Sequence, residues 1–495
     1  MPDPYEQLMN HVRGTASLSQ IAGLLEWDRE VMMPPAGGAQ RAEQAAALEG
    51  VVHARRSDPR IADWLEAADD RNDKRRIANL RLIRRAYDRA TRVPGRLAEE
   101  LARTSAQSAD AWAQARAAND PAAFLPWLEA IVRLRREEAQ ALADGDGPHA
   151  AYDALLAGYE PGMDTARLQP LLEGLRPRLS ALRAAIAESS VKAPAFADTF
   201  EGEAQLALAR QVAERLGYDF TGGRLDLSVH PFSSGTGGDS RITTRLDAHD
   251  PMGCLYTTIH EIGHALYEQG VPRDTLGEPA SAHVSMGVHE SQSRIFENQI
   301  GRSQAFCRWL HPQMVAHMGE TGMADAMALY RAVNRVETGF IRVEADEVHY
   351  NLHVLLRFEL ERDLIGGQIG ARDIEEAWNS RFERDFGLKV PDAAHGFLQD
   401  VHWSLGLFGY FPTYALGNIY AAQLHATLRA EVPDLDAQLA KGDASAVLGF
   451  MRERIHLPAS LDGAAETVER ACGSPLSPEP LLSYLESKYA TLHGM

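Results

Sequence analysis

The sequence predicts a mainly α-helical protein with one small β-hairpin near its centre. Residues 5 to 190 are rich in Ala, Leu, Arg and Glu, and their apolar residues recur every three or four positions. Between residues 222 and 246 this periodicity gives way to alternating apolar and polar residues, which is typical of strands. Helical periodicity returns after Gly270. We therefore expect helices on both sides of a short hairpin.

Length and composition limit the classes of protein to consider. A chain of 495 residues is long enough for two to four domains, or for one large unit with a cleft between lobes. The net charge of −19 argues against a nucleic-acid partner. The sequence has no uninterrupted apolar stretch of about twenty residues, so we expect no membrane span.

The first residues and the cysteines suggest a location in the cell. The start, Met-Pro-Asp-Pro-Tyr-Glu-Gln, has no basic segment followed by an apolar run, so we expect no secretory signal. Cys254, Cys307 and Cys472 are widely separated and odd in number, which favours a reducing compartment. We therefore expect a cytoplasmic protein, in which Cys254 serves packing.

Turn residues divide the first 190 residues into hairpin-like helices. Pro and Gly gather at 33–38, 93–95, 119–121 and 145–148. The segment 74–89 is strongly basic and also carries an apolar stripe at Ile77, Leu80, Ile83 and Tyr87. We interpret its basic side as a solvated helix face rather than as a nucleic-acid or membrane contact.

A β-hairpin is predicted next. Residues 224–232 and 240–246 alternate in strand fashion, and the Ser- and Gly-rich segment 233–238 supplies a turn between them. An exposed strand edge can hold an extended peptide by backbone hydrogen bonds, so the hairpin is a candidate rim of a binding cleft. It could also be a hairpin that only packs on helices.

The segment from Asp250 to Gly270 is predicted to form one helix. Asp250 can cap the first free amides, Pro251 suits the first helical position, and Gly270 can supply a left-handed stop. His260 and His264 are four residues apart, so their imidazoles share one helical face and can bind one metal ion.

The residues between these histidines also fit metal chemistry. Glu261 points to the neighbouring part of the same face, where a carboxylate can take a proton from a metal-activated water. Gly263 costs about 1 kcal/mol relative to alanine inside a helix, which predicts that something approaches the helix closely there. His-Glu-x-x-His is the arrangement of zinc peptidases, although a short motif can also arise by accident.

A second helix, from Val284 to about Gly301, supplies a candidate third ligand. A catalytic zinc needs three protein ligands and an open fourth position. Glu290 lies 26 residues beyond His264, far enough for a helix to return antiparallel and present a carboxylate to the same ion. His289 is adjacent and could ligate instead, although consecutive helical residues do not face the same way.

The rest of the chain is predicted to be helical, with one informative loop. Residues 336–346 open one helical segment, and residues 396–403 begin another. A loop rich in Pro, Gly and aromatic residues runs from Gly409 to Tyr414, just after His402. Loops set on rigid helices often carry binding groups.

Six motifs in this order resemble one family, the Taq-type metallocarboxypeptidases (thermostable carboxypeptidase 1), over nearly the whole chain. The motifs are His230-Pro-Phe232, Asp239-Ser-Arg241-Ile-Thr243, His260-Glu-Ile-Gly-His264, His289-Glu-Ser-Gln292, Ile341-Arg342-Val-Glu-Ala-Asp346 and Gly396-Phe-Leu-Gln399-Asp400-Val-His402-Trp403. Six ordered motifs are far more specific than one.

The resemblance implies a large helical, two-lobed peptidase fold with a deep substrate groove, and a small sheet next to the metal helix. It implies a homodimer that removes single residues from peptide C-termini with broad specificity. We expect one unit, 1–495, in three parts: helical 1–220, hairpin and zinc helices 221–300, and helical 301–495. The implied ligands are His260, His264 and Glu290, with Glu261 as base, the assignment that spacing also gives.

The expected cofactor is one Zn²⁺ per chain, which Co²⁺ or another divalent ion can replace. It would polarise the scissile carbonyl while Glu261 takes a proton and returns it to the leaving amine. For the developing oxyanion we expect a second donor, Tyr410 first and Tyr414 second, although both could be packing residues. We also assign His402 a catalytic role.

Substrate contacts are predicted at Arg342, Arg241, His230 and Tyr414. Arg342 suits the terminal carboxylate of a peptide because a guanidinium stays protonated and can bond both oxygens. Glu344 or Asp346 could hold its fork in place. The alternative for Arg342 is a structural ion pair, which is common for an arginine near acids.

Three other functions are alternatives to a carboxypeptidase. A helical oligopeptidase that cuts internal bonds would share every zinc residue and differ in whether the groove is closed. An aminopeptidase fits less well, because no Gly-x-Met-Glu-Asn element is present to hold a free amine. A non-enzymatic helical scaffold with an accidental motif is a third possibility, and metal analysis distinguishes it.

Overall fold

The computed structural model describes residues 3–145, 147, 149–197 and 199–495, and it is mainly helical with one small sheet, as predicted. Of the break predicted at 145–148, Asp146 and Pro148 lie outside the described residues. The helices before the sheet are α1 (Pro4–Val31), α2 (Gly38–Arg56), α3 (Arg60–Ala67), α4 (Lys74–Arg92), α5 (Gly95–Ala118), α6 (Pro121–Leu142), α7 (Ala150–Leu156), α8 (Thr165–Glu173), α9 (Leu175–Glu188) and α10 (Gly202–Leu216).

The helices after the sheet complete the fold, and none in the described part of the chain is long and apolar enough to cross a membrane. They are α11 (Pro251–Gly270), α12 (Met286–Arg294), α13 (Gln304–Met318), α14 (Ala326–Val333), α15 (Glu347–Gly366), α16 (Ile374–Phe386), α17 (Phe411–Glu431), α18 (Leu435–Leu439), α19 (Ser445–Met451), α20 (Ala464–Cys472) and α21 (Glu479–His493). A π-helical segment, Ile295–Gly301, continues α12.

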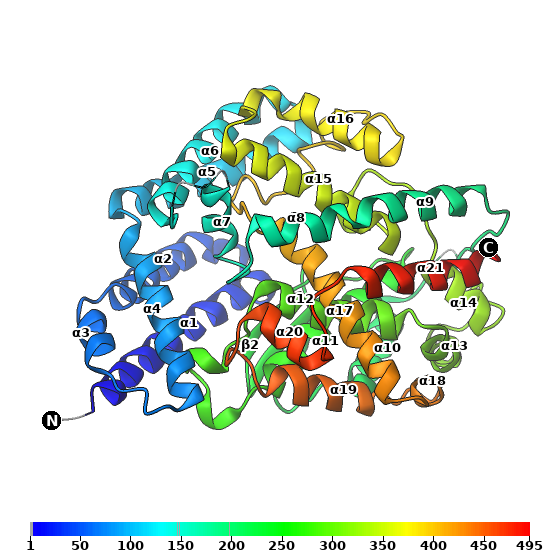
Figure 1. Cartoon of the computed structure of the whole chain (residues 1–495). Helices are drawn as coiled ribbons and strands as arrows, with labels where there is room; N and C mark the ends of the chain where they lie inside the picture. The colour runs from blue at the N-terminus through cyan, green and yellow to red at the C-terminus, as the bar shows by residue number, and fades with distance from the viewer. Residues whose placement is uncertain (1–2, 146, 148, 198) are drawn as a thin grey trace.

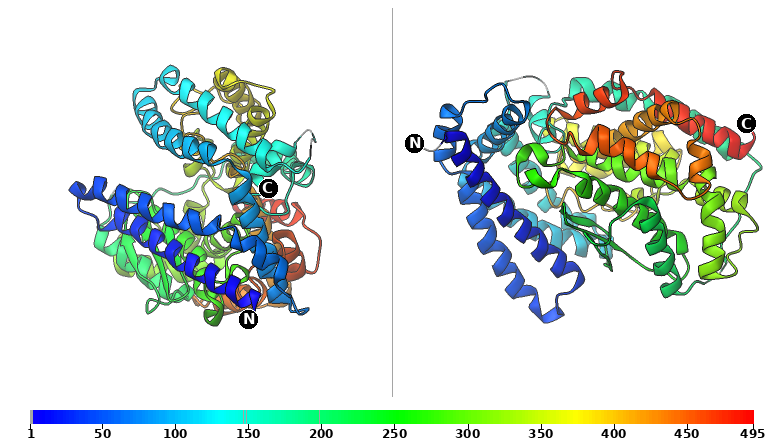
Figure 2. Two further views of the ribbon diagram at one scale, coloured as in Figure 1. Left: turned by 90° about the vertical axis from the view of Figure 1, so that its left-hand side faces the viewer. Right: turned by 90° about the horizontal axis from the view of Figure 1, so that it is seen from below.

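Two groups of helices face each other across the molecule (Figure 1). Helices α5, α6 and α16 form one group, while α1, α2, the sheet and α11 belong to the other (Figure 2). A cavity of about 1360 Å³ is lined by Arg116 of α5 and by His260 of α11, so it spans both groups. We call it the metal cavity. It matches the deep groove that the family resemblance implied.

Helix α4 is only partly the solvated basic face that its sequence suggested. Arg85 and Arg89 donate to the carbonyl oxygens of Ala157 and Ala154, at the C-terminal end of α7, over 3.0 Å each. Carbonyls at helix C-termini lack intrahelical partners and carry partial negative charge. Other α4 arginines reach the carbonyls of Leu142 and Ser460. The guanidinium groups therefore join segments that are far apart in sequence.

The predicted hairpin between residues 224–232 and 240–246 is wrong, because these two segments pair in parallel. Its strands are β1 (Leu225–Leu227), β2 (Ser233–Thr236) and β3 (Asp239–Thr244), in the order β1-β3-β2. β1 pairs in parallel with β3, and β2 pairs antiparallel with it. The hairpin is thus formed by β2 and β3, and the segment predicted as the turn contains β2, an edge strand. The Ser and Gly residues of β2 predicted a turn, because such residues are uncommon in strands.

Helix α11 begins as predicted but ends differently. Asp250 accepts hydrogen bonds from the amides of Met252 and Gly253, and Pro251 is the first helical residue. Gly270 is the last helical residue and is not among the residues with positive φ. A Cβ there would lie 2.4 Å from Nδ1 of His456, so close packing rather than a left-handed stop requires glycine.

Close packing also explains two glycines beside the functional residues. A Cβ on Gly263 would lie 2.4 Å from the carbonyl oxygen of Gln292, which confirms the predicted close approach to α11 there. A Cβ on Gly417 of α17 would lie 2.5 Å from Cγ of Glu290. α12 is therefore held between α11 and α17.

Two predicted helix starts are wrong. α15 begins at Glu347, where Asp346 accepts hydrogen bonds from the amides of Val348 and His349, and a single 3₁₀ turn at Arg342–Glu344 precedes it. Residues 393–410 form successive turns instead of a helix, and α17 begins only at Phe411. A Cβ on Gly409 would lie 2.7 Å from the amide nitrogen of Leu156, so packing against α7 bends this segment.

One hydrophobic cluster of buried residues runs from Ala115 to Leu492 and contains the metal helix. Ile259 and Ile262 of α11 are fully buried in it. The face of α11 that carries His260 and His264 is therefore fixed by the packing of the opposite face.

Candidate metal centre and substrate cavity

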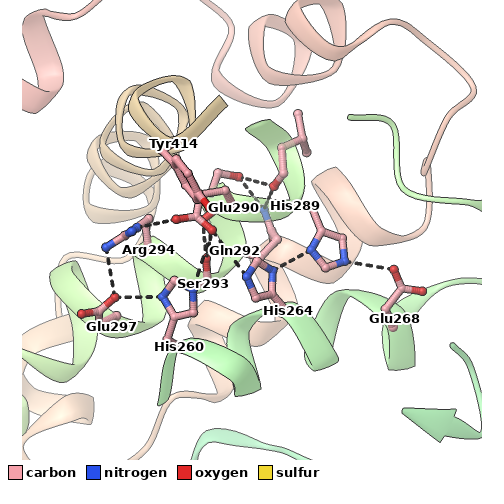
Figure 3. Close-up of polar contacts among 12 residues, drawn as sticks. His260, His264, Glu268, His289, Glu290, Gln292, Ser293, Arg294, Glu297 and Tyr414 are labelled. Carbon is pink, nitrogen blue, oxygen red and sulfur yellow. Dashed lines mark hydrogen bonds and ion pairs between the residues drawn. The ribbon is translucent and has the colours of Figure 1, made fainter. Parts of the chain in front are cut away.

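The two histidines of α11 and Glu290 of α12 converge on one point, as Figure 3 shows. Oε2 of Glu290 lies 3.7 Å from Nε2 of His260 and 3.4 Å from Nε2 of His264. One donor atom from each residue lies within 4.8 Å of the others. These three side chains line the metal cavity.

The donor set fits a divalent transition metal. Ligands at about 2.0–2.2 Å from a tetrahedral zinc lie roughly 3.3–3.6 Å from one another. The separations from Glu290 to the two imidazoles are close to that range. Two imidazole nitrogens and a carboxylate oxygen are also a known ligand set for catalytic zinc, which leaves a fourth position open toward the cavity.

Glu261 lies beside these donors but is not one of them. Its side chain is buried at the cavity wall, and burial raises the pKa of its carboxyl group to about 7, against the opposing effect of His260. Ser233 of β2 hydrogen-bonds this carboxyl group. The edge strand and the carboxylate therefore meet at the same wall.

Each histidine has a different partner behind it. Nδ1 of His260 lies 2.9 Å from Oε2 of Glu297, in the π-helical segment. Nδ1 of His264 lies 2.6 Å from Nδ1 of His289, whose Nε2 lies 3.0 Å from Oε1 of Glu268. His289 thus faces the side of His264 that points away from Glu290, which speaks against His289 as the third ligand.

Arg294 orders the acidic residues around the site. Its Nε donates to Oε1 of Glu290 over 2.6 Å, and its Nη1 lies 3.4 Å from Oε2 of Glu297. Burial opposes ionisation of Glu290, but Arg294 and His260 outweigh burial and hold the pKa of this carboxyl well below its usual range. Glu290 is therefore a carboxylate with one oxygen, Oε2, directed at the two imidazoles.

Sequence reasoning did not identify Glu297, Arg294 or Glu268. A signal for two of them was present, because Arg294 and Glu297 follow Glu290 by four and seven residues and so share its helical face. Glu268 follows His264 by four residues in the same way. The spacing alone did not indicate which of these residues reach the histidines.

Arg342 lies in the cavity wall, yet its partner is not the one predicted. Its Nε and Nη2 donate to Oδ1 of Asp400 over 3.1 and 2.8 Å, and its Nη1 donates to the hydroxyl of Tyr350 over 3.0 Å. Asp346 instead caps α15, and Glu344 is exposed. The guanidinium is therefore held by an aspartate of the turn segment, 58 residues away in sequence.

The aromatic loop places two tyrosines in the metal cavity. Tyr410 and Tyr414 both line it, with ring centroids 5.3 Å apart. His402 is not among the described residues that line the cavity; its Nε2 lies 3.2 Å from the Tyr414 hydroxyl. Burial lowers the pKa of His402 to about 3, despite Asp400, so the ring is neutral. His402 can act through Tyr414 but does not reach the metal cavity itself.

The two remaining predicted residues lie apart from each other. His230 lines the metal cavity on the loop before β2. Arg241 lines a second cavity of about 750 Å³, between α1 and the sheet, where it pairs with Asp239 over 2.7 and 2.9 Å and stacks on Trp27 at 4.2 Å. The contact with Trp27 ties β3 to α1, and Arg241 is not among the described residues that line the metal cavity.

A helical fold with two histidines one turn apart, a glutamate between them and a carboxylate from a second helix defines a metallopeptidase of the His-Glu-x-x-His class. Comparison with known proteins agrees. The model of the carboxypeptidase Taq (M32) metallopeptidase family matches residues 7–489. The chain therefore belongs to the M32 family of metallocarboxypeptidases.

The individual relatives cover the whole chain. Thermostable carboxypeptidase 1 of Thermus thermophilus is 42% identical, with 99% of both chains aligned. Metallocarboxypeptidase 1 of Trypanosoma cruzi has a solved structure with a TM-score of 0.95 at 36% identity, covering 98% of this chain and 99% of that one. The M32 carboxypeptidase of Deinococcus radiodurans R1 gives 0.92 at 37%, covering 99% and 100%. The predicted family and mainly helical fold are confirmed.

Proposed function

We propose that this enzyme releases single C-terminal amino acids from peptides, with broad side-chain specificity, at a zinc ion held by His260, His264 and Glu290. The observation that carries the proposal is the convergence of these three donors in the lining of a cavity of about 1360 Å³. Zn²⁺ suits the donor set, with one ion per chain, and Co²⁺ or another divalent ion can replace it. When bound, the ion supplies a Lewis acid that polarises the scissile carbonyl.

Glu261 is the general base in this proposal. Its carboxylate accepts a proton from the attacking water and returns it to the amine of the departing amino acid. Its buried position at the cavity wall supports the role, because burial raises the pKa of a carboxyl toward the working pH. The hydrogen bond with Ser233 orients the side chain.

Tyr410 donates to the developing oxyanion, with Tyr414 as the second candidate. Both hydroxyl-bearing rings line the metal cavity, and burial raises the pKa of Tyr410 to about 12, which keeps its hydroxyl protonated as a donor. His402 supports catalysis by orienting the hydroxyl of Tyr414 through the contact with its Nε2.

The peptide lies in the metal cavity with its free C-terminal carboxylate on Arg342. Tyr414 and His230 line the same cavity and are the further residues that contact the peptide in this proposal. β2 is an edge strand that begins at Ser233, so its backbone can hold an extended peptide. Arg241 serves the substrate indirectly, by tying this sheet to α1.

Product analysis tests the function. Metal-replete protein, with about one zinc per chain, is incubated with a peptide whose N-terminus is blocked, and fragment masses are followed. We expect a ladder that loses one residue at a time from the C-terminus, and we expect a chelator to abolish it because the ion is held by three ligands. Internal fragments without a ladder would instead identify an oligopeptidase, and a protein that holds no metal would contradict the proposal.

The homodimer is a proposal that rests on family membership. We expect light scattering at micromolar concentration to give twice the chain mass of 54.4 kDa. The mass of one chain at that concentration would refute the dimer.

The proposal places the enzyme in the cytoplasm, acting on peptides and without a nucleic-acid or membrane partner. Cys254, Cys307 and Cys472 are free cysteines, which suits a reducing compartment. We treat residues 1–495 as one catalytic unit, in which 221–300 carries the sheet and zinc helices and 1–220 and 301–495 supply the helical walls. One hydrophobic cluster from Ala115 to Leu492 includes residues of all three parts, which supports a single unit, while Tyr5 to Ile83 form a separate cluster in the first helices.

A further inference from the structure

A second group of potential ligands lies next to the candidate zinc site. Glu268, His283 and His289 each offer one ligand atom, and these atoms lie within 4.8 Å of one another. Glu268 and His283 also line the cavity between α1 and the sheet, on the side away from the metal cavity. The group could bind a second ion or could support the first site. The arrangement of its protons distinguishes these roles.

Two imidazole rings and a carboxylate form one continuous chain of hydrogen bonds. Nδ1 of His264 and Nδ1 of His289 are 2.6 Å apart, and Nε2 of His289 is 3.0 Å from Oε1 of Glu268. The rings of His264 and His289 lie nearly parallel, with centroids 4.6 Å apart and an interplanar angle of 21°. The Tyr267 ring also contacts His289, with centroids 5.5 Å apart. His289 is therefore packed against both rings.

The protons in this chain follow from the ligand role of His264. A neutral imidazole that gives Nε2 to a metal carries its proton on Nδ1. That N–H must donate to Nδ1 of His289, which is therefore the acceptor and carries no proton. The single proton of neutral His289 then lies on Nε2, which donates to Glu268.

The charges along the chain support this arrangement. Because Nδ1 of His289 accepts the hydrogen bond from His264, this ring carries a single proton and is neutral. Burial opposes ionisation of Glu268, but hydrogen bonds from His283 and His289 outweigh it and hold the pKa of the carboxyl well below its usual range. The chain thus ends in a carboxylate that accepts hydrogen bonds.

We propose that His289 and Glu268 are positioning residues that fix the tautomer and ring orientation of His264, and that their group binds no second ion while the first site is filled. Nε2 of His289 carries a proton in this state, so it has no lone pair for a metal. The inference rests on the proposed ligand role of His264. It also distinguishes the two histidine ligands, because His260 contacts a carboxylate directly through Glu297.

Metal affinity tests the positioning role of His289 and Glu268 more directly than turnover does. The dissociation constant for zinc is measured by competition with a chelator of known affinity, in the full-length protein and in variants. We expect His289→Leu to weaken zinc binding by roughly 10–100-fold, because the buried N–H of His264 loses its acceptor. His289→Gln should recover part of that loss, since its amide oxygen can accept. Glu268→Gln, which keeps the size of the side chain, should weaken binding by several-fold to tenfold.

His283→Gln is the matched control. His283 contacts the same carboxylate at 3.3 Å, but its side chain is 40% exposed and it does not touch His264. We expect its zinc affinity to stay within about threefold of the unmodified protein, and one zinc per chain in both. Two zinc ions per chain in the unmodified protein, one of them lost in His283→Gln, would overturn the proposal in favour of a second metal site.

Two further outcomes separate this inference from the proposed function. If His264→Ala retains zinc with unchanged affinity, the ligand assignment itself is wrong. If His264→Ala loses zinc while the zinc affinities of His289→Leu and Glu268→Gln remain within about twofold of that of the unmodified protein, only the positioning role of His289 and Glu268 is wrong. Thermal unfolding of each metal-free variant shows whether it is folded. If His289→Leu does not fold, the zinc affinity of the isosteric Glu268→Gln tests the proposal instead.

Discussion

Glu261→Gln is expected to bind zinc with unchanged stoichiometry and to lose nearly all peptide hydrolysis. The amide has the size of the carboxylate but cannot accept the proton of the attacking water. General bases contribute typically 10²–10⁴-fold, so kcat should fall by roughly that factor. Because Glu261 is not part of the donor set formed by His260, His264 and Glu290, the metal should remain. Zinc content and steady-state kinetics on one blocked peptide measure both effects.

Glu344→Gln is the matched control for this substitution. Glu344 lines the same cavity and undergoes the same change of charge and shape, but its side chain is exposed and it is not part of the donor set formed by His260, His264 and Glu290. We expect its kcat to stay within about threefold of the unmodified enzyme. If Glu261→Gln, with its zinc in place, retained turnover comparable to that of Glu344→Gln, Glu261 would not be the base.

The parts of the site that could be predicted from the sequence lie on single helices. His260, Glu261 and His264 fall within one helical turn, so their relative placement follows from helix geometry alone. Glu290 required one further step, the return of a second helix, which its separation of 26 residues from His264 allows. Gly263 indicated only that something approaches α11 closely. The structure places the carbonyl oxygen of Gln292 2.4 Å from where a Cβ on Gly263 would lie.

The partners of these residues could not be predicted, because they come from tertiary packing. Asp400 reaches Arg342 across 58 residues, whereas the nearer acids Glu344 and Asp346 point elsewhere. Gly270 was interpreted as a left-handed stop, yet it is required by His456 from a distant helix. In both cases the sequence pattern indicated that the residue is important, but a contact with a residue distant in sequence determines its role.

Local patterns also failed where strands and turns are short. β2 consists of Ser, Ser, Gly and Thr, and nothing in that composition favours a strand over a turn. Its pairing with β3, from Ser233 opposite Ile242 to Thr236 opposite Asp239, is what makes it a strand. Residues 393–410 are bent by their contacts with α7 and by Glu361, which accepts from the amide of Gly409 over 3.0 Å.

Arg342→Ala is expected to reduce kcat/KM for peptides with a free C-terminus by tens- to thousands-fold. An exopeptidase must hold the terminal carboxylate at a fixed distance from the metal, and removing a charged partner from a desolvated contact costs about 2–5 kcal/mol. Arg342 has five N–H groups, and Asp400 and Tyr350 accept three of them. One N–H on each terminal nitrogen remains, which is the pair that a carboxylate binds in a fork.

Arg357 should preserve the surroundings of Asp400 in the Arg342→Ala variant. Asp400 also accepts from Nε of Arg357 over 2.7 Å, so it keeps a positively charged partner when Arg342 is removed. The variant is therefore expected to fold, which thermal unfolding checks. Arg335→Ala is the matched control: Arg335 lines the same cavity but is exposed and pairs with Glu337 at 2.9 Å, so its loss should change kcat/KM by less than about threefold.

Peptides with an amidated C-terminus separate the carboxylate contact from a general loss of structure. The unmodified enzyme should cleave them poorly, because the neutral amide cannot form the charged fork with Arg342. Arg342→Ala should lose little more on these substrates, whereas a variant with a distorted cavity would lose activity on both kinds. If the unmodified enzyme cleaved free-acid and amidated peptides equally, Arg342 would not anchor the C-terminus. Its contact with Asp400 would then be a structural ion pair, and cleavage of internal bonds would become the better account of the cavity.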